Sequence, residues 1–140
     1  MKQIFIVIAA CLLSISASAQ IKKFRDIIGT WDITGEQNTG ASLQIIDSST
    51  IVLTYMGERK NITYYKIDFT KSPIWFDFST KDSTSSTLQV KSLLQILGDD
   101  MIKWQLFVDE DRPDHFSSSK GELFYLIRSK SNITSTVVSN

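Results

Sequence analysis

The segment that decides the fold is Gly29-Thr30-Trp31-Asp32, which stands between a removable apolar leader and a series of short alternating strands. A glycine lets the chain turn tightly into a strand, and a tryptophan two residues later can plug one end of a barrel with its large ring. We therefore predict an all-β fold: an eight-stranded antiparallel β-barrel with a short N-terminal helix.

Residues 1–19 have the composition of a signal peptide. Lys2 supplies the positive start, residues 4–13 form the apolar stretch, and Ala17-Ser18-Ala19 is a small-residue cleavage site. The apolar stretch is shorter than the roughly 20 residues that a membrane span requires, and no other stretch approaches that length. We expect an exported protein, periplasmic or extracellular, with no transmembrane segment.

A second interpretation of the leader is a lipoprotein signal, because Ile8-Ala9-Ala10-Cys11 resembles the site at which bacterial lipoproteins are cut and acylated on cysteine. The residues after Cys11 continue the apolar run and do not begin a polar tether, which favours cleavage after Ala19. The mature chain then has no cysteine, and so neither disulfides nor thiolate ligands.

Composition limits both size and partners. The mature chain of about 120 residues is long enough for one core, so we predict one domain over 20–129 and a flexible C-terminal tail over 130–140. Lys and Arg number 15, as do Asp and Glu, and neither sign dominates a long stretch. Nothing in this charge pattern favours nucleic acid or an anionic membrane surface as a partner.

The periodicity of apolar residues changes at Gly29. From Ile21 to Ile28 the spacing is helical, and Gly29 ends that helix. Thereafter the period is two, with turn residues every eight to twelve positions, as in all-β barrels. The eight predicted strands are 30–35, 42–46, 50–55, 62–68, 74–79, 87–97, 101–108 and 122–129.

Three of these strands have one clearly apolar face, which we expect to point inward. These faces are Ile51, Leu53 and Tyr55; Trp104, Leu106 and Val108; and Leu123, Tyr125 and Ile127. Large apolar side chains also lie on the opposite faces, where the helix, the tail or a partner must cover some of them. These are Leu93, Leu97, Phe107, Phe124 and Leu126.

In this order, the leader, short helix, Gly29-x-Trp31 motif and eight strands resemble the lipocalin-like (calycin) superfamily. Residues 65–78, 98–102 and 112–116 resemble further signatures of a small family of uncharacterised exported bacterial lipocalin-like domains. The resemblance implies fold and export, since that family has no settled activity. The strand 88–97 departs from it by lacking an expected glycine and tyrosine.

In such barrels a basic side chain of the last strand stacks on the tryptophan of the first. Arg128 is our first candidate here and Arg112 the second, while Trp31 could instead be a plain core residue. The residues assigned to this structural motif are Gly29, Trp31, Arg112, Pro113, Phe116 and Arg128.

The residues that could carry chemistry are scattered. His115 is the only histidine, and the acidic runs 109–111 and 99–100 lack the spaced glycine of a calcium loop. Asp32, Asp68 and Asp77 all lie in predicted strands, but no spacing pairs any two of them. We predict a non-catalytic protein without a metal site or cofactor.

The aromatic residues are the remaining functional signal. Tyr55, Phe76, Trp104 and Tyr125 could line a barrel mouth that holds a small apolar or amphipathic ligand. The alternative is a filled barrel that serves as a protein-interaction module of the bacterial envelope, an inhibitor or a complex subunit, through exposed Phe107, Phe124 and Leu97. An enzyme is the third interpretation, and in each case we expect a monomer.

Overall fold

The computed structural model describes residues 22–34, 40–82 and 84–130 of the 140. The predicted signal peptide over 1–19, the lipoprotein site at Cys11 and the tail from 131 onward lie outside the described residues. Inside them, no helix has the length and apolar character needed to cross a membrane.

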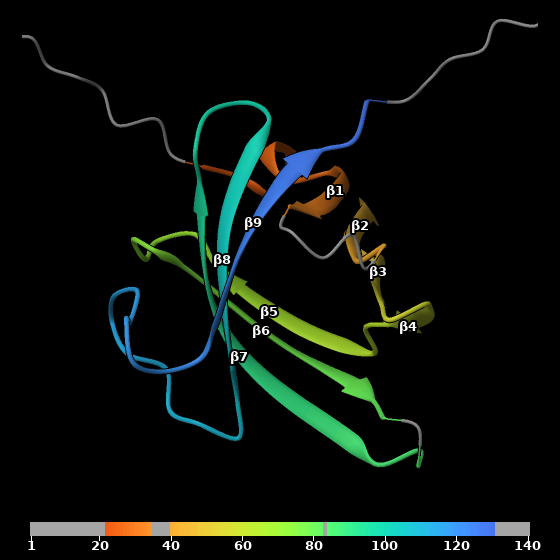
Figure 1. Ribbon diagram of the computed structural model, residues 1–140. Helices are drawn as coiled ribbons and strands as arrows, with labels where there is room; N and C mark the ends of the chain where they lie inside the picture. The colour runs from red at the N-terminus through yellow and green to blue at the C-terminus, as the bar shows by residue number, and fades with distance from the viewer. Residues whose placement is uncertain (1–21, 35–39, 83, 131–140) are drawn as a thin grey trace, which may run out of the picture.

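One 3-10 turn, η1 (Phe24–Asp26), precedes nine strands (Figure 1). The strands are β1 (Gly29–Thr34), β2 (Ser42–Asp47), β3 (Thr50–Tyr55), β4 (Glu58–Asn61), β5 (Tyr64–Asp68), β6 (Ile74–Lys81), β7 (Thr87–Ile96), β8 (Met101–Val108) and β9 (Glu122–Arg128).

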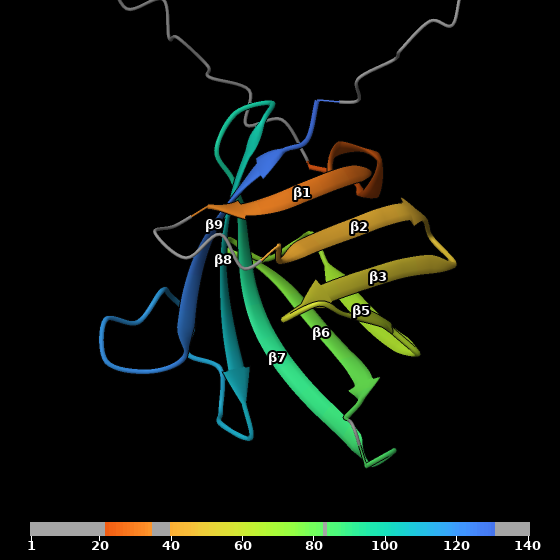
Figure 2. The same cartoon turned by 45° about the vertical axis from the view of Figure 1, so that its right-hand side comes forward.

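All nine strands form a single antiparallel sheet in the order β4-β3-β2-β1-β9-β8-β7-β6-β5. Each strand pairs with a neighbour in the chain, and the first strand also pairs with the last. The sheet curls into a half-barrel (Figure 2), with edges at β4 and β5. The all-β antiparallel prediction is confirmed, but the prediction of eight strands in a closed barrel is wrong.

The additional strand arises from a tight hairpin. Tyr55 pairs with Glu58, so only Met56 and Gly57 form the loop, and both have positive φ (51° and 77°). Two residues with positive φ make the turn type that matches the twist of paired strands. The sequence pattern did not reveal β4 because its four residues, Glu58–Asn61, are all polar and show no alternation of apolar and polar side chains.

The gap between β4 and β5 is crossed without a strand ladder. Ile62 donates its backbone N–H to Ile51 O (2.9 Å), and Thr63 donates its own to Ser79 O (3.0 Å). The Tyr65 hydroxyl donates to Ser48 O, at the β2–β3 turn (2.5 Å). These three hydrogen bonds hold the segment between β4 and β5 against β3, β6 and the β2–β3 turn. The two edges of the sheet are therefore close together at this place.

The pairing of β1 with β9 joins the two ends of the chain. Trp31 lies opposite Arg128, whose guanidinium carbon is 4.1 Å from the Trp31 ring centroid. Arg128 Nη1 donates to Ile28 O (2.6 Å), and Trp31 Nε1 donates to Ile27 O (2.8 Å). A cation over an indole, with both side chains also bonded to backbone, is a strong local anchor.

The N-terminal helix is shorter than expected. Instead of one or two helical turns over 21–28, only Phe24–Asp26 is helical, and it is 3-10. The next two carbonyls, of Ile27 and Ile28, accept the bonds from Trp31 and Arg128, and the Ile27 side chain is fully buried. The helix therefore ends at Asp26, because the residues that follow it are held by the core and by bonds from Trp31 and Arg128.

The concave side of the sheet is filled by aromatic rings. Phe76 and Trp104 are fully buried and stack with centroids 6.0 Å apart, and Phe78 packs against both at 5.3 and 5.9 Å. The Trp104 Nε1 atom donates to Ser92 Oγ (2.9 Å), which satisfies its one polar atom. Phe76 and Trp104, two of the residues expected to line a barrel mouth, are therefore part of the core.

The inward face of β9 is the opposite of the predicted one. Leu126 is fully buried, whereas Leu123, Tyr125 and Ile127 are 43, 41 and 43% exposed. Because Arg128 turns inward to meet Trp31, the period of two also turns Leu126 inward and the odd-numbered residues outward. The Arg128 contact thus decides the register that the apolar pattern left ambiguous.

The contact between Trp31 and Arg128 requires a glycine at position 29. Its φ is +144°, and a Cβ there would lie 2.5 Å from Arg128 Nη1. We predict that Gly29→Ala lowers the free energy of unfolding by roughly 1–3 kcal/mol from backbone strain, and further by displacing Arg128.

Gly57→Ala is the matched control, because its φ is also positive but no atom lies within 4 Å of the added Cβ. It should cost about 1 kcal/mol. Urea unfolding followed by tryptophan fluorescence compares the two variants, and equal losses would show that Gly29 is needed for its backbone alone.

Candidate functional site

A long loop after β8, residues 109–121, lies on the convex side of the sheet. In both views it stands on the side of β7, β8 and β9 away from β2 and β3 (Figures 1 and 2). Beneath it, Leu93 and Phe107 are fully buried although they face outward from the barrel. The loop is therefore the cover that these outward apolar residues require.

Gln105 holds this loop to the sheet. Its Nε2 atom donates to Ser117 O and Lys120 O, and its Oε1 atom accepts from the Ser117 N–H, each at 2.8 Å. Gln105 is itself buried, so these bonds satisfy its amide. Gly121 allows the end of the loop to lie directly against β8, because a Cβ there would lie 2.5 Å from Leu106 O.

Arg112 is the second anchor. Its guanidinium carbon lies 3.9 Å from the centroid of the Trp75 ring, and its Nη1 atom forms an ion pair with Asp77 Oδ1. The side chain is only 10% exposed, and its Nε atom has no hydrogen-bond partner among the described residues. Arg112 therefore joins the loop to β6 mainly through its ring contact and one carboxylate.

Two further residues of the assigned structural motif, Pro113 and Phe116, lie in the same loop as Arg112. Pro113 and Phe116 are half-buried, and Lys103 Nζ lies 4.2 Å from the Phe116 ring centroid. The segment 112–116 thus serves to dock the loop, whereas Gly29, Trp31 and Arg128 lie together where β1 meets β9.

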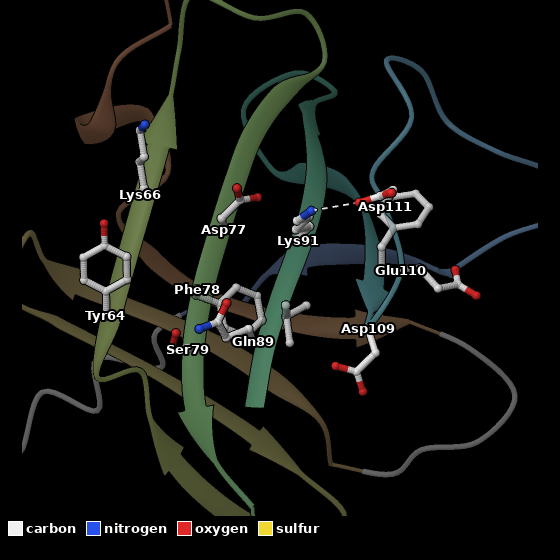
Figure 3. Close-up of a pocket in the computed structure, with 12 residues that line it drawn as sticks. Tyr64, Lys66, Asp77, Phe78, Ser79, Gln89, Lys91, Asp109, Glu110 and Asp111 are labelled. Atoms are coloured by element: carbon white, nitrogen blue, oxygen red, sulfur yellow. Dashed lines mark hydrogen bonds and ion pairs between the residues drawn. The ribbon is translucent and has the colours of Figure 1, made fainter. Parts of the chain in front are cut away.

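Between the loop and β5 lies a cavity of about 530 Å³, which we call the outer groove. Its floor comes from β6 and β7, one wall from β5, and the other from the turn after β8 (Figure 3). The lining residues are Tyr64, Lys66, Asp77, Phe78, Ser79, Gln89, Val90, Lys91, Phe107, Asp109, Glu110 and Asp111.

Charges in the groove are partly paired. Lys91 Nζ lies 3.1 Å from Asp111 Oδ1, and Asp77 is paired with Arg112. Lys66, Asp109 and Glu110 form no ion pair with another described residue. The unpaired ammonium lies on the β5 wall and the unpaired carboxylates on the opposite wall.

The residues expected to line a barrel mouth are dispersed. Phe76 and Trp104 are packed in the core, Tyr125 is on the outer face of β9, and Tyr55 is exposed at the β3–β4 hairpin. The structure brings only Phe76 and Trp104 into contact.

Hydrogen bonds lower the pKa values of two carboxyl groups outside the outer groove. Hydrogen bonds from the Thr70 hydroxyl and backbone lower the pKa of Asp68, and the Thr84 hydroxyl, with backbone N–H groups, lowers that of Asp82. Asp68 ends β5 and Asp82 follows β6, and each carboxylate accepts bonds from a threonine two positions later. Among the described residues, no three His, Cys, Asp or Glu side chains are placed to hold a metal ion.

Sequence reasoning did not single out Gln105 or the outer groove. A polar residue between Trp104 and Leu106, in a strand with six apolar residues, was the available signal for Gln105. Its loop partners, however, lie 12 and 15 residues further along the chain.

Comparison with known proteins gives no relative: no family model, no curated protein and no solved structure matches the chain. The site must therefore be interpreted from its own geometry.

Removal of the Gln105 amide tests the docking of the loop. We predict that Gln105→Leu lowers the free energy of unfolding by about 3 kcal/mol, because three hydrogen bonds are lost at about 1 kcal/mol each. Trypsin should then cleave after Lys120 much faster, as followed by mass spectrometry.

Gln95→Leu is the control, since Gln95 is exposed on β7 and should change stability by less than about 0.5 kcal/mol. If Gln105→Leu is no more sensitive to trypsin than this control, the amide does not hold the loop.

Proposed function

We propose that the chain is an exported, non-catalytic, lipocalin-like protein that acts as a protein-interaction module through its outer face. The observation that carries this proposal is the packing of the interior, where Phe76 stacks on Trp104 and Phe78 packs against both rings. A barrel of this size either fills with side chains or holds one small ligand, and the ring packing favours the first.

The leader over 1–19 and the signatures quoted above support export to the periplasm or beyond and membership in the lipocalin-like group. His115 supports the non-catalytic part, because it is exposed and its side chain bonds to no described residue. A catalytic histidine needs a partner within hydrogen-bond reach.

The exposed apolar residues also favour a partner, although they are not the ones that the sequence indicated. Phe107 is buried under the loop and Phe124 is half-buried, whereas Leu97 stays exposed. In their place, Leu123, Tyr125 and Ile127 form a stripe along β9, with Met101 opposite Ile127 on β8. Contiguous exposed apolar surface is typical of interaction sites.

Binding of apolar probes distinguishes a filled barrel from a ligand carrier. We predict no saturable binding of a fluorescent fatty acid or of anilinonaphthalene sulfonate to the folded protein, and no rise in melting temperature. A ligand that occupied the interior at 100 times its Kd would stabilise the fold by about 2.7 kcal/mol.

A lipocalin with a known apolar ligand is the positive control for the assay. Saturable binding at one probe per chain, with quenching of Trp104, would contradict the proposal and restore the ligand-carrier interpretation.

A further inference from the structure

We propose that the outer groove binds an extended segment of a partner protein in which a basic side chain and an acidic side chain lie about four residues apart. This inference rests on the proposed function, since it specifies the chemistry of the partner at that face.

The charge of the groove is separated between its two walls. In the middle, Asp77 is neutralised by Arg112 and Lys91 by Asp111. What remains is Lys66 on β5 and, across the groove, Asp109 and Glu110. A single small ion would pair with the charge on only one wall, and a neutral sugar would pair with neither. A peptide segment that carries one positive and one negative side chain can form an ion pair with each wall.

The distance between the two walls sets the number of residues between the two charged side chains of the peptide. From β5 to β8 the sheet crosses three inter-strand intervals, or about 14 Å. An extended chain advances about 3.3 Å per residue, so about four residues cover that span. The cavity of about 530 Å³ is within the range of roughly 300–1,000 Å³ that ligand sites occupy.

The floor is suited to a peptide backbone. Ser79 and Gln89 lie side by side on β6 and β7, and neither side chain bonds to a described residue. A hydroxyl and an amide supply both donors and acceptors, which is what successive peptide N–H and C=O groups require. Tyr64, 65% exposed on the adjacent wall, adds a ring face and a hydroxyl.

The experiment titrates the purified protein with blocked peptides and records amide NMR shifts. The probe peptide has an acetylated N-terminus, an amidated C-terminus, and one lysine and one glutamate separated by three serines. Its comparison peptides replace the lysine, the glutamate or both by glutamine. We expect each charge removed to raise Kd by about two- to fivefold, and the amide shifts to map to β5 and the 109–111 turn.

A charge exchange makes the test specific. Lys66→Glu should weaken binding of the lysine–glutamate peptide at least fivefold and should favour a peptide that carries two lysines. Lys81→Glu is the matched control, because Lys81 is an exposed lysine of β6 outside the outer groove, and it should leave both peptides unaffected.

Three results would overturn the inference: equal affinity for the charged and neutral peptides, insensitivity to Lys66→Glu, or tighter binding of maltohexaose than of any peptide. None of them would reverse the apolar-probe result. The filled-barrel proposal fails only if a probe enters the interior, so the two failures are distinguishable.

Discussion

The contact between Trp31 and Arg128 is the one on which the rest of the structure depends. It lies where the first strand meets the last, and it joins two runs of strands that have no other ladder between them, because β4 and β5 do not pair. The same contact turns Arg128 and Leu126 inward and so sets which face of β9 is buried. Gly29 leaves the space that this arrangement needs.

The convex side of the sheet carries both the 109–121 loop and the outer groove. Phe76, Phe78 and Trp104 pack closely against one another on the inward side of the sheet and support it from within. On that support, Gln105 and Arg112 hold the 109–121 loop, which in turn forms one wall of the outer groove. Binding surfaces on loops held by a rigid scaffold are common in β proteins.

The sequence predicts the local part of this architecture well. Alternation of period two locates most strands, and Gly29-x-Trp31 with a basic residue in the last strand indicates where the chain ends meet. It does not predict β4, because that strand consists of four polar residues and has no apolar face. Nor does it predict the loop, since both faces of β8 carry large apolar residues and only the three-dimensional contacts of Gln105 show what covers the outer one.

The most direct test of the central claim is a double-mutant cycle on the two residues that join β1 to β9. Trp31→Leu, Arg128→Met and the double variant are compared by urea unfolding. A cation over an indole should give a coupling energy of about 1–2 kcal/mol, whereas the bonds of Arg128 to Ile28 and Asp99 cancel in the cycle. A coupling energy within about 0.3 kcal/mol of zero would show that Trp31 is an ordinary core residue and would contradict the account.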